Sequence, residues 1–360
     1  SLMLVVAAVG FVAISSARAE EGSELEISGN VDVVSGWQRG LKNANFASEG
    51  LLGDGLAASA AGKGTDVFGF VVDQVEMDLA KSFGENIRIR ADLDFTPAGP
   101  GKAGILGGNG DFLVEQAYTT ANIPAGNGIE LLVGRFNSGI GLDPVDRNEL
   151  KTISHNMVHR TLLPHNLTGA RLGYDFNDQV RWEIFIVNNL GDVIGANSDM
   201  PSLGTNVSYA WGDEGNKSWI KFSAAAGPER ATKKGWTFLG DLSGNFAATE
   251  ALTIAAEGTY RQDDQAVANA QFFGGDLQGT YAFSDVWDGT LRYSYIWDLD
   301  FGQVGSAFGS GIVTNDVVGI PGLFYAGQNH ELSLATGYQI TEGARFGLEG
   351  RLDLANASAA

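Results

Sequence analysis

Residues 86–95 read NIRIRADLDF, a stretch in which apolar and charged residues alternate one for one. The charged row consists of Arg88, Arg90, Asp92 and Asp94. Successive side chains of a strand point to opposite faces, so the pattern predicts a β-strand with one apolar and one charged face. A soluble sandwich would bury the apolar row. A membrane barrel would turn the apolar row to lipid and line its lumen with the charges.

The same alternation recurs in about fifteen segments beyond residue 24. Examples are ELEISGNVDVV (24–34), LRYSYIWD (291–298) and ARFGLEGRLDL (344–354). Most segments are long enough to cross a bilayer as a tilted strand, which takes roughly 9 to 11 residues. Strands of soluble proteins are usually nearer 5 or 6 residues. Segment length therefore favours the membrane barrel.

The links between these segments alternate between long and short. Long links include residues 38–65, 96–111, 137–165 and 299–326, and short links include 82–86, 124–128, 177–178 and 341–343. Short periplasmic turns and longer extracellular loops are typical of transmembrane barrels, and a soluble sandwich has no reason to maintain this rhythm. We therefore expect an all-β, transmembrane, antiparallel up-and-down β-barrel of about 16 strands.

The amino-terminal residues differ from the alternating segments. Residues 1–19 form an apolar run that ends in Ala17-Arg18-Ala19, which matches the small-residue pattern of a signal-peptide cleavage site. A transmembrane anchor is the alternative. We expect a signal peptide over 1–19, incomplete at its amino end, followed by an outer-membrane barrel over 20–360.

The strand count itself raises a question, because bacterial single-chain barrels have an even number of strands. Fifteen alternating segments are odd, and the simplest interpretation is that a closing sixteenth strand is missing from this sequence. A miscounted strand is the alternative.

The charged row of each strand is expected to face the lumen. Its members are Arg88, Arg90, Asp92, Asp94, Arg171, Arg181, Glu183, Glu257, Arg261, Arg292, Arg345 and Glu349. So many charges cannot close into a dry core without a severe desolvation cost. A barrel of about 16 strands leaves an aqueous channel. We therefore expect a water-filled lumen.

The third long link, residues 137–165, is rich in ionisable side chains. It carries Asp143, Asp146, Arg147, Glu149, Lys151, His155, His159 and Arg160. A short helix over residues 145–159 would place His155 and His159 on one face. Folded into the lumen, the link would form a constriction that filters solutes by size and charge. The alternative is a loop that only covers the mouth of the barrel.

Residues 133–176 also carry a family resemblance. The matching motifs are Gly134-Arg135-Phe136, Gly139-Ile140-Gly141, and Thr168-Gly169-Ala170-Arg171 with Tyr174. Here the chain resembles the beta-barrel porin type 2 family of bacterial outer-membrane barrels. The resemblance implies an outer-membrane porin and leaves its solute open.

Composition excludes several function classes. The 360-residue chain has a net charge of −20 and no cysteine, and its acidic balance argues against nucleic acid as a partner. His155 and His159 lack the glutamate of an H-E-x-x-H zinc site, and no nucleophile motif surrounds Ser154. We expect no enzyme activity, no cofactor and no metal.

The combined features predict a porin in the outer membrane of a Gram-negative bacterium. It would allow passive diffusion of small hydrophilic solutes or ions, with outer-membrane lipid as its other partner and a homotrimer as one open assembly. The alternatives are a plugged structural or adhesive outer-membrane barrel without transport, and a soluble secreted β-rich binding protein.

Overall fold

The computed structural model describes residues 2–14, 25–39, 67–95, 113–191, 200–213, 217–229, 235–264, 269–299 and 327–357. Most of the predicted long links 38–65, 96–111 and 299–326 therefore lie outside the described residues. The third long link, in contrast, is described throughout.

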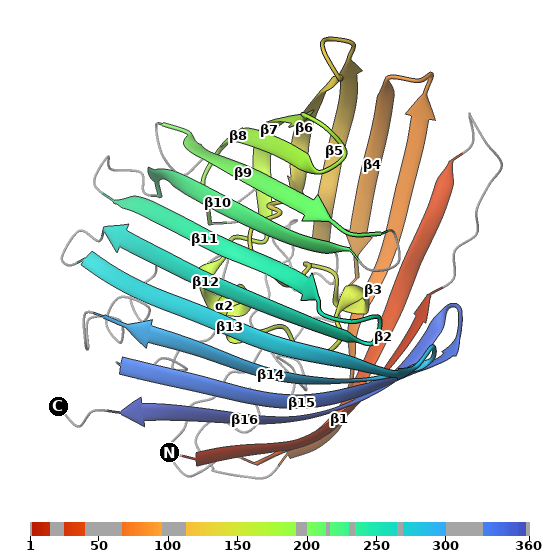
Figure 1. The fold of residues 1–360 in the computed structure, drawn as a ribbon, viewed down its shortest axis with the longest axis vertical. Helices are drawn as coiled ribbons and strands as arrows, with labels where there is room; N and C mark the ends of the chain where they lie inside the picture. The colour runs from red at the N-terminus through yellow and green to blue at the C-terminus, as the bar shows by residue number, and fades with distance from the viewer. Residues whose placement is uncertain are drawn as a thin grey trace.

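Long antiparallel strands make up most of the described chain (Figure 1). They are β1 (Leu2–Ile14), β2 (Glu26–Arg39), β3 (Val67–Phe83), β4 (Ile87–Asp94), β5 (Leu113–Ile123), β6 (Ile129–Asn137), β7 (Asn166–Asp175), β8 (Val180–Val187), β9 (Ser202–Trp211), β10 (Ser218–Pro228), β11 (Trp236–Ala247), β12 (Leu252–Asp264), β13 (Asn269–Ser284), β14 (Trp287–Asp298), β15 (Gly327–Thr341) and β16 (Ala344–Ala357). Each strand from β2 to β16 pairs with its neighbours in the chain, so the sheet is up-and-down. The ring closes through β1, which pairs with β16 on one side and β2 on the other.

The fifteen strands β2 to β16 confirm the alternating segments seen in the sequence. Short connections, such as residues 84–86, 124–128 and 342–343, alternate with long ones as expected. Strand β1 occupies the position between β16 and β2 for which the sequence predicted a missing sixteenth strand, and it lies within the segment expected to be a signal peptide. Both expectations stay predictions.

The strands bury polar side chains and expose apolar ones. In the opening stretch Ile87 and Ile89 on β4 are 45% and 44% exposed, whereas Asp92 is fully buried. Leu334 on β15 is 65% exposed, and Arg292 on β14 is fully buried. This inversion is the arrangement that a lipid-facing barrel requires, because lipid solvates the apolar row and the interior holds the charges.

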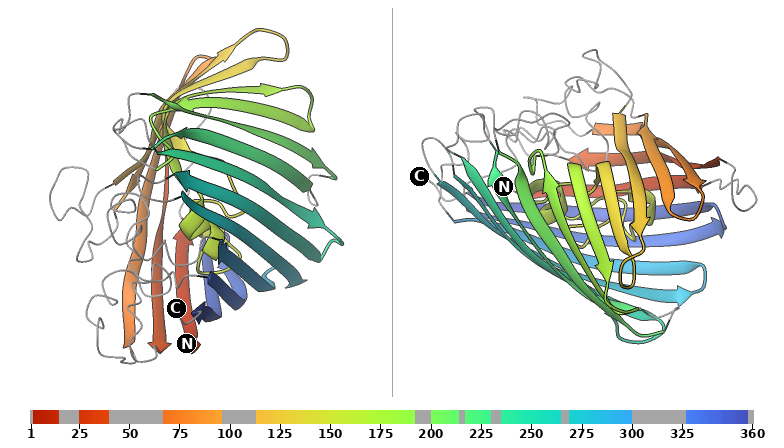
Figure 2. Two further views of the ribbon diagram at one scale, coloured as in Figure 1. Left: turned by 90° about the vertical axis from the view of Figure 1, so that its left-hand side faces the viewer. Right: turned by 90° about the horizontal axis from the view of Figure 1, so that it is seen from above.

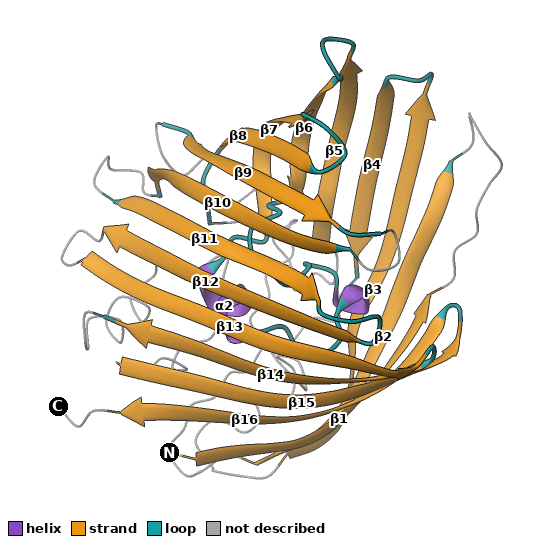
Figure 3. Ribbon diagram, viewed as in Figure 1, coloured by secondary structure: helices purple, strands orange, loops and turns teal. Residues whose placement is uncertain are grey.

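Two short helices lie in the link between β6 and β7. They are the 3₁₀ helix η1 (Arg147–Glu149) and the α-helix α2 (Met157–Leu162). Figure 3 marks both as helix, and the views of Figure 2 place α2 on the inner side of the sheet, where it contacts β12, β13 and β14. Within the described residues, no helix is long and apolar enough to span a membrane.

The prediction of a single short helix over residues 145–159 is wrong, because only Arg147–Glu149 and Met157–Leu162 are helical. Helix α2 begins only after Asn156, whose side-chain oxygen accepts a hydrogen bond from the backbone N–H of His159 at 2.6 Å. An asparagine in this role starts a helix, because it satisfies one of the N–H groups that lack a partner in the first turn. His155 therefore precedes the helix rather than sharing a face with His159.

A charge placed on the outer face should destabilise the barrel. Leu277 lies near the middle of β13 and is 55% exposed. We expect Leu277→Arg to lower the free energy of unfolding in lipid by about 2–4 kcal/mol, as for cations at the bilayer midplane. Reversible urea unfolding in lipid vesicles measures this loss.

The adjacent residue supplies the control. Gln278 points to the other face and lies opposite Arg292 in the β13–β14 register. Gln278→Glu should leave the unfolding midpoint nearly unchanged. Equal losses in the two variants would contradict the assignment of lipid-facing and lumen-facing rows.

Candidate functional site

The link between β6 and β7, residues 138–165 and hereafter the inner loop, is closed at its base. The backbone N–H of Ser138 donates to the carbonyl of His165 at 2.7 Å, and the Ser138 hydroxyl donates to the carbonyl of Pro164 at 2.6 Å. At Gly141 the backbone has a φ of +96°, and an added Cβ would lie 2.3 Å from a methyl group of Leu163. Glycine is therefore needed where the inner loop turns against its own returning segment.

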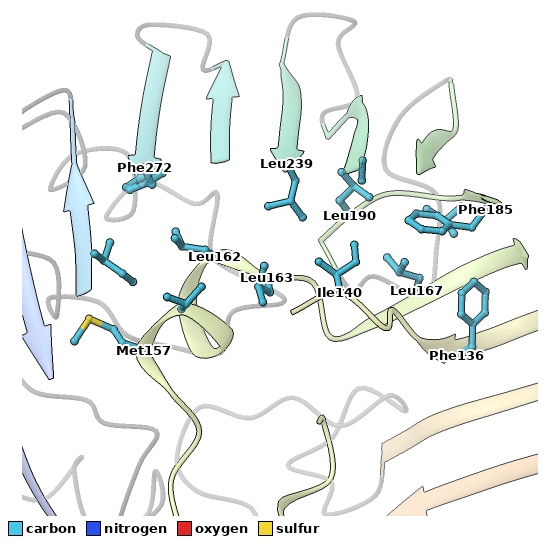
Figure 4. Close-up of a cluster of buried hydrophobic side chains, with 14 of the residues drawn as sticks. Phe136, Ile140, Met157, Leu162, Leu163, Leu167, Phe185, Leu190, Leu239 and Phe272 are labelled. Carbon is cyan, nitrogen blue, oxygen red and sulfur yellow. The ribbon is translucent and has the colours of Figure 1, made fainter. Parts of the chain in front are cut away.

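An apolar surface on the inside of the barrel holds the inner loop (Figure 4). Val158 and Leu162 of α2 are 0% and 1% exposed, and they belong to the same buried cluster as Phe185, Leu239 and Phe272 of the strands. Burying such side chains contributes about 1.5–3 kcal/mol each. The cluster therefore stabilises the inner loop against the wall.

The sequence carries a signal for this apolar surface, which strict alternation does not predict. In EIFIV (183–187) and QFF (271–273) both rows of the strand become apolar, which breaks the alternation. Phe185 and Phe272, which belong to the inward rows, are 3% and 1% exposed. A break in the polar row thus marks the place where the inner loop packs.

Two inward-facing charges of the wall hold residues 152–155 of the inner loop. The Glu349 carboxylate accepts the backbone N–H groups of Ile153 and Ser154 at 2.7 and 2.8 Å. The Arg292 guanidinium donates to the Thr152 hydroxyl and the Ser154 carbonyl, both at 2.7 Å. Both charges face inward as expected, but the inner loop covers them.

A buried ionic network surrounds this contact. Arg160 of the inner loop pairs with Glu331 on β15, and Glu331 also accepts from Arg292 at 2.9 Å. Arg351 lies 3.7 Å from the same carboxylate. A buried charge that loses its partner typically costs 3–5 kcal/mol. The network therefore attaches the inner loop to the wall, and each charge in it has an oppositely charged partner.

Strand β12 adds a third point of contact. The Glu257 carboxylate accepts the backbone N–H of Leu142 at 2.8 Å and the Asn156 side-chain amide at 3.3 Å. Arg261 donates to the carbonyl of Leu162 at 2.9 Å. These contacts bind β12 to the first part of the inner loop at Leu142 and to its returning part at Asn156 and Leu162.

The remaining predicted lumen charges form pairs along the wall. The pairs are Arg88–Glu26 (2.7 Å), Arg90–Asp92 (2.7 Å), Arg171–Glu183 (3.6 Å), Arg181–Glu183 (3.0 Å) and Arg345–Asp288 (2.7 Å). Asp94 lies opposite Glu76 in the register between β3 and β4. The side chains of Arg88, Arg90 and Arg181 are 44%, 33% and 30% exposed, so part of the inward row remains accessible.

The predicted constriction residues do not form one cluster. Arg147 and Glu149 lie in η1, and Lys151 is 3.9 Å from Asp288 with 52% of its side chain exposed. Asp143 accepts the backbone N–H of Asn156 at 2.7 Å. Asp146 lies close to two carboxylates of the wall, those of Glu76 and Glu115. Burial, and then the nearby Glu149 and wall carboxylates, raise the pKa of Asp146 to about 6.

Three histidines of the inner loop stack on one another. The ring centroids of His155 and His159 are 4.4 Å apart, and those of His159 and His165 are 4.3 Å apart. His155 donates from Nε2 to the carbonyl of Pro144 at 3.0 Å. Burial is the main cause that lowers the pKa values of His155 and His159 well below 6.5, followed by repulsion from neighbouring cationic groups. Both imidazoles are therefore neutral at pH 7.

The histidine stack should make barrel stability depend on pH. Because the folded-state pKa of His159 is depressed, the unfolded chain binds more protons below about pH 6.5, and stability falls as the pH decreases through that window. At pH 5 the loss reaches at most about 2 kcal/mol per histidine. We expect His159→Phe, which keeps a flat ring, to lose less stability than the wild type between pH 7 and pH 5.

Asp146 changes the stability in the opposite direction, but equally in the wild type and in His159→Phe. The difference between the two proteins therefore measures the contribution of His159. The raised pKa of Asp146 increases stability as the pH falls through about 6 toward 3.8, and it does so in both proteins. Urea midpoints at the two pH values provide the measurement. Parallel pH profiles would show that the buried stack does not control the acid response.

Comparisons with known proteins agree with this architecture. The outer membrane channel DcaP of Acinetobacter baumannii is similar in structure, with a TM-score of 0.55, 13% identity, and coverage of 98% of this chain and 96% of that chain. OmpT of Vibrio cholerae has a TM-score of 0.52 at 9% identity, covering 94% and 99%. An anion-selective porin from Comamonas acidovorans has a TM-score of 0.51 at 10% identity, covering 98% and 97%. These likenesses show the fold.

A search of curated proteins finds no match. A family model described as "Putative beta-barrel porin-2, OmpL-like" matches residues 24–359, which include the inner loop and every strand from β2 to β16. The match confirms the resemblance seen in residues 133–176. The chain belongs to this porin family, and it is an outer-membrane channel protein for solute diffusion.

Proposed function

We propose that the inner loop is the constriction of this porin, and that small hydrophilic solutes or ions pass beside it by passive diffusion. One observation carries this proposal: the inner loop is bound to the inner wall along its length. It contacts β12 through Glu257, β14 through Arg292 and β16 through Glu349. A loop held at these points narrows the channel that it crosses, as other pore-lining segments do.

The exposed inward charges favour an open channel over a plugged barrel. A plug that filled the lumen would bury the wall charges, as the inner loop buries Arg292 and Glu349. Arg88, Arg90 and Arg181 keep about a third or more of their side-chain surface exposed. These arginines would border the solute path, where paired charges of both signs favour hydrated solutes.

The proposed mechanism needs no reaction. Solutes would be selected by the space beside the inner loop and by the charges that face it. We infer that the protein is not an enzyme, because a channel with paired wall charges accounts for its inward side chains without a nucleophile or a general base.

Channel recordings test the transport proposal. Purified protein in planar bilayers should give stepwise conductance, and liposomes that contain it should swell in solutions of small sugars. Channel-free bilayers and unswollen liposomes would instead support the plugged structural or adhesive barrel.

Displacing the inner loop should widen the channel. Val158 is fully buried in the apolar cluster, so Val158→Asp would place an unpaired carboxylate there and release α2 from the wall. We expect single-channel conductance to rise at least about twofold, because the strands pair without the inner loop.

A valine outside the inner loop provides the matched control. Val286 lies in the turn between β13 and β14 and is 43% exposed, so Val286→Asp should leave conductance unchanged. Unaltered conductance in a folded Val158→Asp barrel would place the constriction elsewhere.

We also propose that residues 1–19 are a signal peptide. The apolar segment differs in pattern from the alternating strands β2 to β16, and it ends in a cleavage pattern at Ala17-Arg18-Ala19. Mass spectrometry of protein extracted from outer membranes should find Glu20 as the amino terminus. An amino terminus upstream of Glu20 would contradict cleavage at this site.

A homotrimer is the assembly that we propose for the barrel in the membrane. Support comes from fold likeness, since OmpT of Vibrio cholerae has been described in a trimer form. Light scattering of the detergent-solubilised protein should give three chains per particle, and a monomer in mild detergent would contradict it.

A further inference from the structure

Three carboxylates from separate segments meet on one part of the inner wall. They are Glu76 on β3, Glu115 on β5 and Asp146 of the inner loop, and one oxygen from each lies within 4.8 Å of the other two. Glu76 and Glu115 are 6% and 4% exposed. Among the ion pairs of the described residues, none involves these three carboxylates.

In a neighbouring pair of carboxylates, an arginine neutralises the negative charge. Asp78 and Asp92 are directly opposite each other on β3 and β4, which would be unfavourable for two unpaired anions. Arg90 lies between them, 2.7 Å from Asp92 and 3.9 Å from Asp78. The arginine therefore compensates this pair, and no arginine in the described ion pairs does so for Glu76, Glu115 and Asp146.

Glu115 gives independent evidence of a missing ligand. Its Oε1 atom is shielded from solvent and has no hydrogen-bond partner. Glu76 receives a hydrogen bond from the Asn30 side-chain amide at 2.6 Å, while the Asn30 oxygen, also buried, has no partner. Buried acceptors without donors are costly, and a group of such oxygens is what a bound cation would satisfy.

We propose that Glu76, Glu115 and Asp146 bind a calcium ion between the inner loop and the wall. Calcium takes oxygen ligands at 2.3–2.6 Å, so two ligands of one ion are at most about 5 Å apart, which fits the spacing of these carboxylates. The cluster offers neither imidazole nor thiolate, which are the ligands that zinc prefers.

The ion would give the inner loop a further attachment. Arg292 and Glu349 hold residues 152–155 against β14 and β16, whereas the calcium would hold Asp146 against β3 and β5. Calcium binding does not depend on solute transport, so a channel test and a binding test can fail separately.

Equilibrium dialysis of the intact detergent-solubilised protein against ⁴⁵Ca²⁺ tests the site. Sodium chloride at 0.1 M screens diffuse attraction to the acidic lumen, and the dialysis is run at pH 7.5. We expect one calcium per chain, bound at least tenfold more tightly than magnesium. Glu115→Gln and Asp146→Asn should each weaken binding at least tenfold.

Asp241→Asn is the matched control. Asp241 is also a buried inward carboxylate, but Thr259 and Ser243 donate to it at 2.8 and 3.0 Å. Its replacement should leave calcium affinity unchanged. Asp146 lies outside the strands, so Asp146→Asn decides the matter if Glu115→Gln does not fold.

Three results would overturn the proposal. They are the absence of calcium binding at millimolar concentrations, wild-type affinity in Asp146→Asn, and a uniform weakening in all variants that includes Asp241→Asn. The last result would show diffuse attraction to an acidic lumen rather than a site.

Discussion

A bilayer offers no hydrogen-bond partner to a peptide group, and this constraint determines the rest of the structure. Every strand must pair with two neighbours, so the sheet must form a ring. Strands β2 to β16 pair in chain order and β1 fills the position between β16 and β2. If residues 1–19 are cleaved as we propose, another strand must occupy that position. Once the ring exists, lipid solvates the outer row and only the inner row can carry charge. The inverted burial of Ile87 and Asp92 follows directly from this geometry.

The charged side chains of the inner row then need partners of their own. Where water reaches the wall, pairs such as Arg88–Glu26 remain partly exposed. Where the inner loop covers the wall, its backbone and Arg160 replace water as partners for Glu349, Arg292 and Glu331. The wall charges therefore differ in their surroundings: some stay partly exposed, and others hold the inner loop, which we propose narrows the channel.

Much of the fold could be predicted from the sequence, because alternation and link length are local. NIRIRADLDF alone left the inner face of β4 open. Segment length and the alternation of long and short links predicted that the charged row faces inward, and the burial of Asp92, Arg292 and Glu349 confirms it. The contacts of the inner loop were not local. Nothing near Asp146 in sequence indicates that it approaches Glu76 and Glu115, which depends on how the loop crosses the lumen.

Two differences in the inner loop have clear physical causes. The helix expected over 145–159 is interrupted, because Asn156 caps α2 and residues 152–155 bind the wall in place of forming helical turns. Strict alternation does not predict the apolar surface under α2, because Phe185 and Phe272 stand in the inward rows where alternation requires polar residues, and the inner loop packs there.

If the inner loop lies beside the path of permeating ions, a charged group attached to it should reduce their current. The protein contains no cysteine, so Lys151→Cys introduces a unique thiol on the inner loop, at a side chain that is 52% exposed. A bulky thiol-reactive sulfonate should reduce the single-channel current of this variant in steps and leave the wild type unaffected. Full labelling of the thiol with unchanged current would contradict the account.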